Sequence, residues 1–160
     1  MSVQTGIPFH VAASAEEVVR FADVLICATR SKSPVLEVGW VQLGTHVNTI
    51  GPKFKGMSEM PYELAQWSQV IATDSPEQVD SYPEPFFLLG TPERGQMLDL
   101  SEIVVGKQNG RSFPNDITLF CSVGLAGAEV VVANEALKLW QAGSQKKADK
   151  ETGRGVGEVP

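Results

Sequence analysis

Short apolar runs alternate with helical patterns along most of this chain, and that alternation limits the folds it can adopt. The first strong run, Asp23–Thr29 (DVLICAT), is almost continuously apolar, as is typical of a strand buried on both faces of a parallel sheet. Before it, Ser14 and Glu17 have the spacing of a helix-capping box. This alternation predicts an α/β fold with a parallel sheet. The other predicted strands are Thr45–Ile50, Gln69–Thr73, Ile117–Phe120 and a short one at Phe9–Ala12.

Helical patterns occupy most of the intervals, and proline marks the exceptions. The proline-rich stretch Ser81–Gly95 is expected to be mostly loop. From Ala142 onward the chain consists of Gly, Lys and small polar residues without periodicity. We therefore expect one domain over residues 1–142 and a mobile polar tail over 143–160. The predicted helices are Ala15–Phe21, Pro61–Trp67, one capped by Asp74 or Ser75 with Pro76 in its first turn, Leu98–Val105, and Ala126–Trp140.

Composition narrows the class of protein. A length of 160 residues with 42% hydrophobic content is ordinary for one globular domain. No apolar run approaches the roughly 18 residues of a membrane span. The first ten residues, MSVQTGIPFH, show no secretory signal pattern, so we expect a cytoplasmic protein without a membrane partner. The net charge of -6 argues against nucleic acid as a partner, because such proteins usually carry a basic excess.

The chain contains few residues of the types that form metal or nucleophile sites. Cys27 and Cys121 each lie in an apolar run and are expected to be small buried hydrophobic residues. His46 is interpreted as a strand histidine with a backbone partner, since a histidine without companions rarely binds metal. The sequence contains no GxGxxG fingerprint, no GxxxxGK[ST] loop, no HExxH and no CxxC. No metal site is predicted.

Three segments stand out together because they lie at predicted strand ends. They are ADVLICATRSKSPVL (Ala22–Leu36), GTHVNTIGPKF (Gly44–Phe54) and DITLFCSVGLA (Asp116–Ala126). Ligands of open α/β sheets bind at the carboxyl ends of the strands. The backbone N–H groups of Ser122, Val123 and Gly124 precede a helix, a place suited to an amide or an anion.

In the order and spacing of these segments, from about Gly6 to Trp140, the chain resembles the ornithine cyclodeaminase/mu-crystallin family. The resemblance implies NAD or NADP as cofactor, a small amino or imino acid as substrate, and a homodimer or other self-association. It implies an α/β fold, a partial Rossmann-like doubly wound parallel sheet lacking the first strands and the substrate/dimerisation domain. On this interpretation the chain is a truncated member, since the glycine fingerprint and the main substrate-carboxylate ligands of the family have no counterpart in it.

The resemblance assigns cofactor-binding positions, each with a structural alternative. Ala28 and Thr29 correspond to residues that line the cofactor, or simply end a strand. Asn48 and Gly51 correspond to a strand end near the nicotinamide ribose, although Gly51 also suits a turn before Pro52.

The third set of positions follows the last predicted strand. Ser122, Val123 and Gly124 match the segment that meets the nicotinamide, or form an ordinary helix cap. Asp116 is expected to cap or orient that strand, and Asp74 and Ser75 are interpreted as helix caps only.

One departure from the family concerns the chemistry. Ornithine cyclodeaminase-type members place an acidic acid/base residue shortly after the NxxG motif, and alignment on Asn48 and Gly51 puts Lys53 there. Lys53 is the candidate catalytic residue, a proton donor if burial lowers its pKa. A solvated loop lysine beside Lys55 is the commoner situation and the favoured alternative.

Two functions from different classes are consistent with this sequence. The first is an ornithine cyclodeaminase-like, NAD(P)-dependent amino- or imino-acid oxidoreductase or deaminase, with activity impaired by truncation. The second is a non-catalytic remnant that acts as a binding or self-associating protein, because loss of strands exposes an edge that invites pairing.

Overall fold

The computed structural model describes residues 5–151, with side chains described for 5–144. The chain divides into two compact units, Met1–Gly124 and Leu125–Pro160. The described residues of the second unit form one helix, α7 (Ala126–Glu151). This helix runs past the predicted end at Trp140 and includes the first residues of the predicted tail, whose residues 152–160 lie outside the described part. No helix among the described residues is long and apolar enough to cross a membrane.

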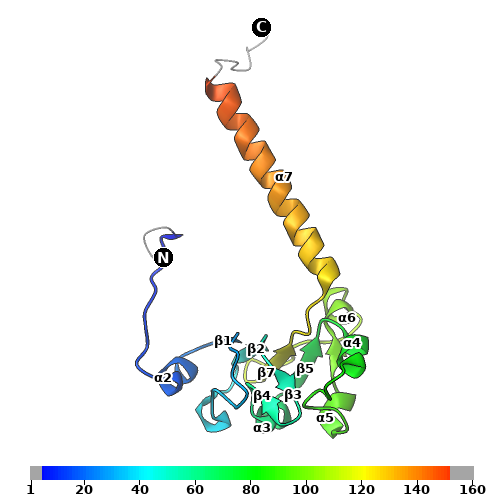
Figure 1. Cartoon of the computed structure of the whole chain (residues 1–160). Helices are drawn as coiled ribbons and strands as arrows, with labels where there is room; N and C mark the ends of the chain where they lie inside the picture. Colours follow the sequence, from blue (N-terminus) through cyan, green and yellow to red (C-terminus); the bar gives the residue numbers. More distant parts are fainter. Residues whose placement is uncertain (1–4, 152–160) are drawn as a thin grey trace. The chain divides into compact units, whose positions relative to one another are not determined.

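A five-stranded parallel sheet forms the centre of the first unit, which confirms the predicted α/β class (Figure 1). Its strand order is β1-β2-β7-β5-β6, so consecutive strands are often separated by crossovers. Each of the four predicted central runs contains one strand. The strands are β1 (Val24–Cys27), β2 (His46–Thr49), β5 (Val70–Thr73), β6 (Leu98–Asp99) and β7 (Thr118–Cys121).

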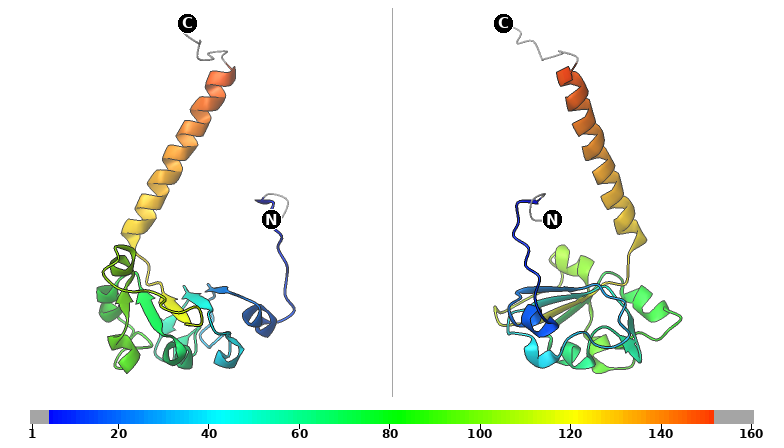
Figure 2. Two further views of the ribbon diagram at one scale, coloured as in Figure 1. Left: turned by 180° about the vertical axis from the view of Figure 1, so that it is seen from behind. Right: turned by 60° about the vertical axis from the view of Figure 1, so that its left-hand side comes forward.

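Helices cover the two faces of this sheet unequally. Helices α2 and α3 lie on one face, whereas α6 lies on the other, as two views show (Figure 2). On the second face Val24 and Ile26 of β1 remain 58% and 66% exposed. The helical elements of this unit are α2 (Ala15–Arg20), the 3-10 turn η1 (Val38–Trp40), α3 (Tyr62–Trp67), α4 (Pro76–Ser81), α5 (Pro92–Gly95) and α6 (Leu100–Val104).

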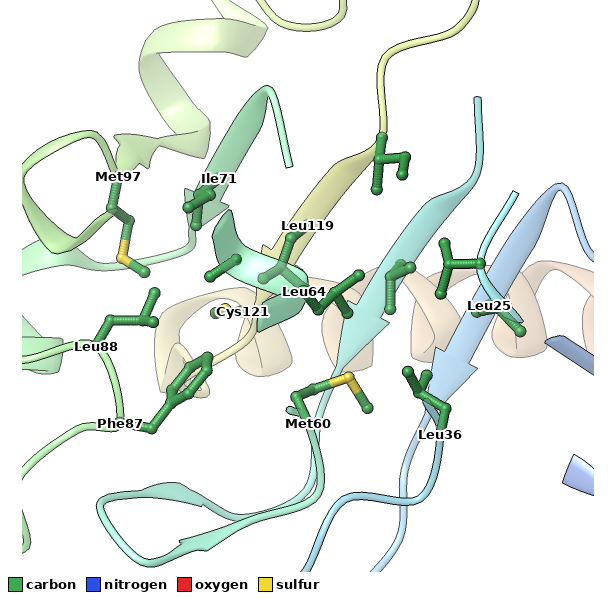
Figure 3. Packing of buried hydrophobic residues seen from close by; sticks show 14 of the residues in the cluster. Leu25, Leu36, Met60, Leu64, Ile71, Phe87, Leu88, Met97, Leu119 and Cys121 are labelled. Atoms are coloured by element: carbon green, nitrogen blue, oxygen red, sulfur yellow. The ribbon is translucent and has the colours of Figure 1, made fainter. Parts of the chain in front are cut away.

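The hydrophobic core lies on the well-covered face (Figure 3). The strands contribute side chains to this core because every second residue of a strand points to the same face. Leu25, Val47, Leu119 and Ile71, one from each of four neighbouring strands, are all at most 4% exposed. The other side of the core comes from α3, from the residues just before it and from the segment between α4 and β6. Its members include Leu64, Met60, Phe86, Phe87, Leu88 and Met97.

Local capping chemistry explains where the helices begin. The Ser14 hydroxyl accepts the Glu17 N–H, and the Glu17 carboxylate accepts the Ala13 N–H, as the capping-box spacing predicts. The Ser75 hydroxyl accepts the Gln78 N–H at the start of α4, where Pro76 is the first helical residue. Both helices therefore begin where the sequence predicts.

Several local predictions are wrong, each for a physical reason. Residues 9–12 form no strand, and Phe9 and Val11 stay exposed, so this apolar run lacks the half-buried surroundings that favour a strand. The predicted helix at Leu98–Val105 begins two residues later, since Leu98 and Asp99 extend the sheet beside β5. A hairpin appears within an expected loop, where Gly56 at φ 74° turns the chain between β3 (Lys53–Phe54) and β4 (Met57–Ser58).

Candidate active site at the carboxyl edge of the sheet

Parallel pairing brings the predicted site segments to one edge of the sheet. Cys27 is in register with Thr49, and Thr49 with Cys121, so β1, β2 and β7 end side by side. Residues 28–29, 50–51 and 122–124 directly follow those ends, and Asn48 is on β2 itself. The structure therefore gathers the three candidate segments at the edge where open α/β sheets bind ligands.

A buried carboxylate joins the first two of these strand ends. Glu59 is 0% exposed, and it follows the β3–β4 hairpin, which returns the chain to the edge. Its Oε2 accepts the Thr29 N–H and hydroxyl, both at 2.8 Å. Its Oε1 accepts the Thr49 hydroxyl at 2.7 Å, and the N–H groups of Ile50 at 3.1 Å and Gly51 at 2.6 Å. One side chain thus fixes the ends of β1 and β2.

The hydrogen bonds to Glu59 decide its charge. Burial acts to raise the pKa of its carboxyl, because a charge is costly away from water. The donors from Thr49, Thr29 and Gly51 act in the opposite direction and together hold the pKa below its usual range. Glu59 is therefore ionised at neutral pH, a buried anion stabilised by hydrogen bonds.

Gly51 is required by this close approach. A Cβ at this position would overlap the Glu59 carboxylate and the Thr29 carbonyl oxygen. The φ angle of Gly51 is not in the positive range, so space and not backbone conformation demands glycine here. The expectation of a conformational turn before Pro52 is accordingly replaced by a steric reason.

Lys53 is buried, contrary to the favoured expectation of a solvated loop lysine. It opens β3 and is only 6% exposed, whereas Lys55 in the adjoining turn is exposed. The Lys53 Nζ donates to the Gly51 carbonyl oxygen at 2.6 Å. Burial lowers its pKa, and the charges of Cys121, Glu59 and Asp74 partly oppose that shift. The hairpin, which the sequence analysis missed, is what carries this lysine inside.

A second carboxylate occupies the N–H groups that the sequence suggested for a ligand. Asp74 follows β5, and its Oδ1 accepts the Val123 N–H at 2.7 Å. Its Oδ2 accepts the Ser122 hydroxyl at 3.1 Å and the Gly124 N–H at 3.2 Å. The cap of α4 is Ser75, whereas Asp74, which the sequence analysis interpreted as a cap, accepts from Ser122 and the residues after it. The anion that these groups bind in this structure is the chain's own.

The remaining candidates have structural partners. His46 Nδ1 lies 2.7 Å from the Thr118 hydroxyl, a side-chain partner instead of the expected backbone one. Cys121 is fully buried as expected, and burial raises the pKa of its thiol to about 12, whereas Cys27 is only partly buried. Asp116 accepts the N–H groups of Ser112 and Phe113. Within residues 5–144 no cluster of potential metal ligands occurs.

Sequence reasoning missed Glu59 altogether, and it missed the role of Asp74 in holding the segment after β7. Asp74 had a signal, because it is an acidic residue directly after a predicted strand, at the same edge as the other segments. Glu59 had a weaker one, since nothing local marks an acid in a loop as buried. Its hydrogen bonds to Thr29 span thirty positions of sequence, so only the fold reveals them.

Comparison with known proteins identifies relatives of this chain. The family model described as "Ornithine cyclodeaminase/mu-crystallin family" matches residues 1–143. An alanine dehydrogenase of Archaeoglobus fulgidus is 34% identical over 122 residues, covering 74% of this chain and 37% of its own length. The chain thus spans about two fifths of the curated relatives that it matches.

Solved structures agree. The Thermococcus litoralis Delta(1)-pyrroline-2-carboxylate reductase, in complex with NADH and L-proline, superposes with a TM-score of 0.69 at 35% identity. That match covers 78% of this chain and 40% of the reductase. An archaeal alanine dehydrogenase dimer with bound NAD gives a TM-score of 0.68 at 31% identity, over 83% of this chain and 42% of the other. The parallel sheet is therefore Rossmann-like.

Proposed function

Because the chain belongs to the ornithine cyclodeaminase/mu-crystallin family, we propose that it takes part in NAD(P)-dependent oxidation or reduction of a small amino or imino acid. The observation that carries this proposal is the meeting of three candidate segments at one carboxyl edge, set by the register Cys27–Thr49–Cys121. Of the two solved structures named above, the reductase is in complex with NADH and L-proline, and the alanine dehydrogenase has bound NAD.

The side chains at the strand ends are small enough to leave space for a nicotinamide group. Ala28 and Gly124 are small and exposed, and a Cβ added at Gly124 meets nothing within 4 Å. In this proposal Ala28, Thr29, Asn48, Gly51 and residues 122–124 hold the cofactor, which when bound gives or takes a hydride. Glu59 and Asp74 keep the ends of the strands in place, and Lys53 is the candidate proton donor.

A thermal unfolding titration of this chain with NADH and with NADPH tests the proposal. A ligand that binds only the folded state adds about 2.7 kcal/mol at about 100 times its dissociation constant. We expect a saturable rise in Tm with one of the two. Ala28→Trp should abolish it by filling the edge, whereas Ala15→Trp, at an exposed position of α2, should keep it. No rise for the unsubstituted chain, with cooperative unfolding intact, would contradict the proposal.

A second candidate function, binding or self-association without catalysis, is supported by exposed apolar residues of α7. Val130, Leu137 and Trp140 are 68%, 51% and 68% exposed, at spacings that share one side of the helix. Sedimentation at increasing protein concentration tests it. This function predicts an oligomer that dissociates in the Leu137→Glu variant. It also predicts no change in Tm on addition of NADH or NADPH.

A further inference from the structure

Lys53 has hydrogen-bonding capacity that its surroundings do not use. An ammonium group carries three N–H donors. Among the described residues the Gly51 carbonyl oxygen is its one hydrogen-bond acceptor, at 2.6 Å. The residue is nevertheless buried, at 6% exposure. The ammonium is thus paired with one carbonyl oxygen, and its other two N–H donors can bind a further oxygen.

The neighbouring carboxylates do not provide this further oxygen. Glu59 already accepts five hydrogen bonds, from Thr29, Thr49, Ile50 and Gly51. Asp74 accepts from the segment after β7 instead. None of the ion pairs among the described residues includes Lys53. The two anions contribute charge at a distance, and the N–H donors of Lys53 stay available for another oxygen.

The position of this ammonium connects it to the site. Its acceptor, Gly51, is bound through its own N–H to Glu59, so Lys53 is tied to the ends of β1 and β2 by two consecutive short hydrogen bonds. The ammonium is therefore a cation fixed beside the strand ends that form the carboxyl edge. A fixed cation favours anionic oxygens and repels ammonium groups, and the effect is strong where water is scarce.

We infer that Lys53 binds an acidic group of the substrate, so that the substrate class is an amino or imino acid with a carboxylate in its side group, and not a diamino acid. This inference rests on the proposed function, because it takes the carboxyl edge as the substrate site. It assigns the protonated form of Lys53 a role in binding the substrate, in addition to the proposed role as proton donor. A phosphate oxygen of a cofactor offers similar chemistry, and the experiment separates the two sources.

Binding of small probes to the full chain without cofactor tests this inference. We expect succinate to bind saturably and to move the Cε resonance of Lys53 in 13C-lysine-labelled protein. Butyrate should bind at least tenfold more weakly and 1,4-diaminobutane not at all. Tenfold weaker binding of succinate is expected for Lys53→Met, unchanged binding for Lys55→Met in the same hairpin, and retained binding for Lys53→Arg, which keeps the cation. Circular dichroism confirms that each variant folds.

The opposite outcomes are equally specific. Equal affinity of succinate for Lys53→Met and the unsubstituted chain would overturn the inference. A response of Lys53 to pyrophosphate but not to succinate would overturn it too, by assigning the lysine to a cofactor phosphate. Because no probe is a nicotinamide, failure here leaves the NADH titration standing, and failure of that titration leaves succinate binding to be read independently.

Discussion

Two carboxylates hold strand ends at the same edge of the sheet, but in different environments. Glu59 connects β1 to β2, is fully buried and accepts five hydrogen bonds from those two strand ends. Asp74 connects β5 to the segment after β7, is partly exposed and accepts three from that segment. In both cases a carboxylate accepts N–H groups of residues that directly follow the ends of strands.

The difference lies in what would replace the carboxylate if it were removed. Water can reach the N–H of the exposed Gly124 beside Asp74, so a lost hydrogen bond there is partly replaced. The donors around Glu59 include the fully buried Thr49, which has no such access. The β1–β2 half of the edge thus depends on one side chain more strongly than the β5–β7 half does.

Glu59→Gln should produce the largest loss of stability. The amide brings donors toward groups that are themselves donors, and breaking a buried charged network costs about 3–5 kcal/mol. Urea unfolding at pH 7 measures the change. The exposed Glu63 of α3 provides the control, because Glu63→Gln should stay within about 0.5 kcal/mol. Equal effects of the two substitutions would contradict the assigned role of Glu59.

The lowered pKa of Glu59 predicts that the effect of Glu59→Gln depends on pH. The folded-state pKa of Glu59 is lowered, so between that value and the unfolded value near 4.3 the unfolded chain binds more protons. The stability that Glu59 contributes is therefore complete above about pH 5 and is lost as the pH falls through the folded pKa. The difference in unfolding free energy between the unsubstituted chain and Glu59→Gln should shrink on acidification.

Gly51→Ala should come next in size. The added Cβ overlaps the Glu59 carboxylate and the Thr29 carbonyl, and overpacking of this kind costs about 1–3 kcal/mol. Gly39→Ala is the matched control, since a Cβ there meets nothing within 4 Å. Chemical denaturation of both variants decides the matter, and a loss at Gly51 no larger than at Gly39 would show that the strand ends can relax.

The two halves of the edge also differ in how far the sequence predicts them. Strand positions and parallel pairing follow from apolar runs, and helix starts follow from Ser14 and Ser75, because both signals are local. The sequence also identifies residues 28–29, 48–51 and 122–124 as strand-end segments. It misses the carboxylates that hold them, since Glu59 meets Thr29 only after the crossover from β1 to β2 is complete.

The burial of Lys53 was beyond local reasoning for a related reason. Lys53 and Lys55 are two residues apart in the same polar-looking loop, and their surroundings in the sequence are alike. Lys53 lies in β3 and is buried, whereas Lys55 lies beyond the end of this strand, in the turn at Gly56, and is exposed. A two-residue strand is too short to leave a periodic pattern.

Asp74→Asn should be milder than Glu59→Gln. The amide keeps one acceptor for the Val123 N–H, but it loses the charge that strengthens the bonds to Ser122 and Gly124. Each charge-assisted bond contributes about 1.5–3 kcal/mol, and solvent access at Gly124 reduces the net loss to about 1–2 kcal/mol. Asp23→Asn, at an exposed position before β1, should change little. A loss equal to that of Glu59→Gln would remove the contrast between the two halves.

The smallest effect expected is a change in slope, and it comes from Lys53. Burial lowers its folded-state pKa, so between that value and about 10.4 the unfolded chain binds more protons and stability rises with pH. Lys53→Met removes that contribution. The unfolding free energy of the methionine variant, relative to that of the unsubstituted chain, should therefore decrease from pH 7 toward pH 10. This decrease amounts to about 1.4 kcal/mol for each unit of pKa lowering. Urea unfolding at several pH values measures it, with Lys55→Met as the control whose difference from the unsubstituted chain stays flat. If the difference in unfolding free energy for Lys53→Met is also independent of pH, the ammonium is as well solvated in the folded chain as in the unfolded one. That result would contradict the contrast between Lys53 and Lys55.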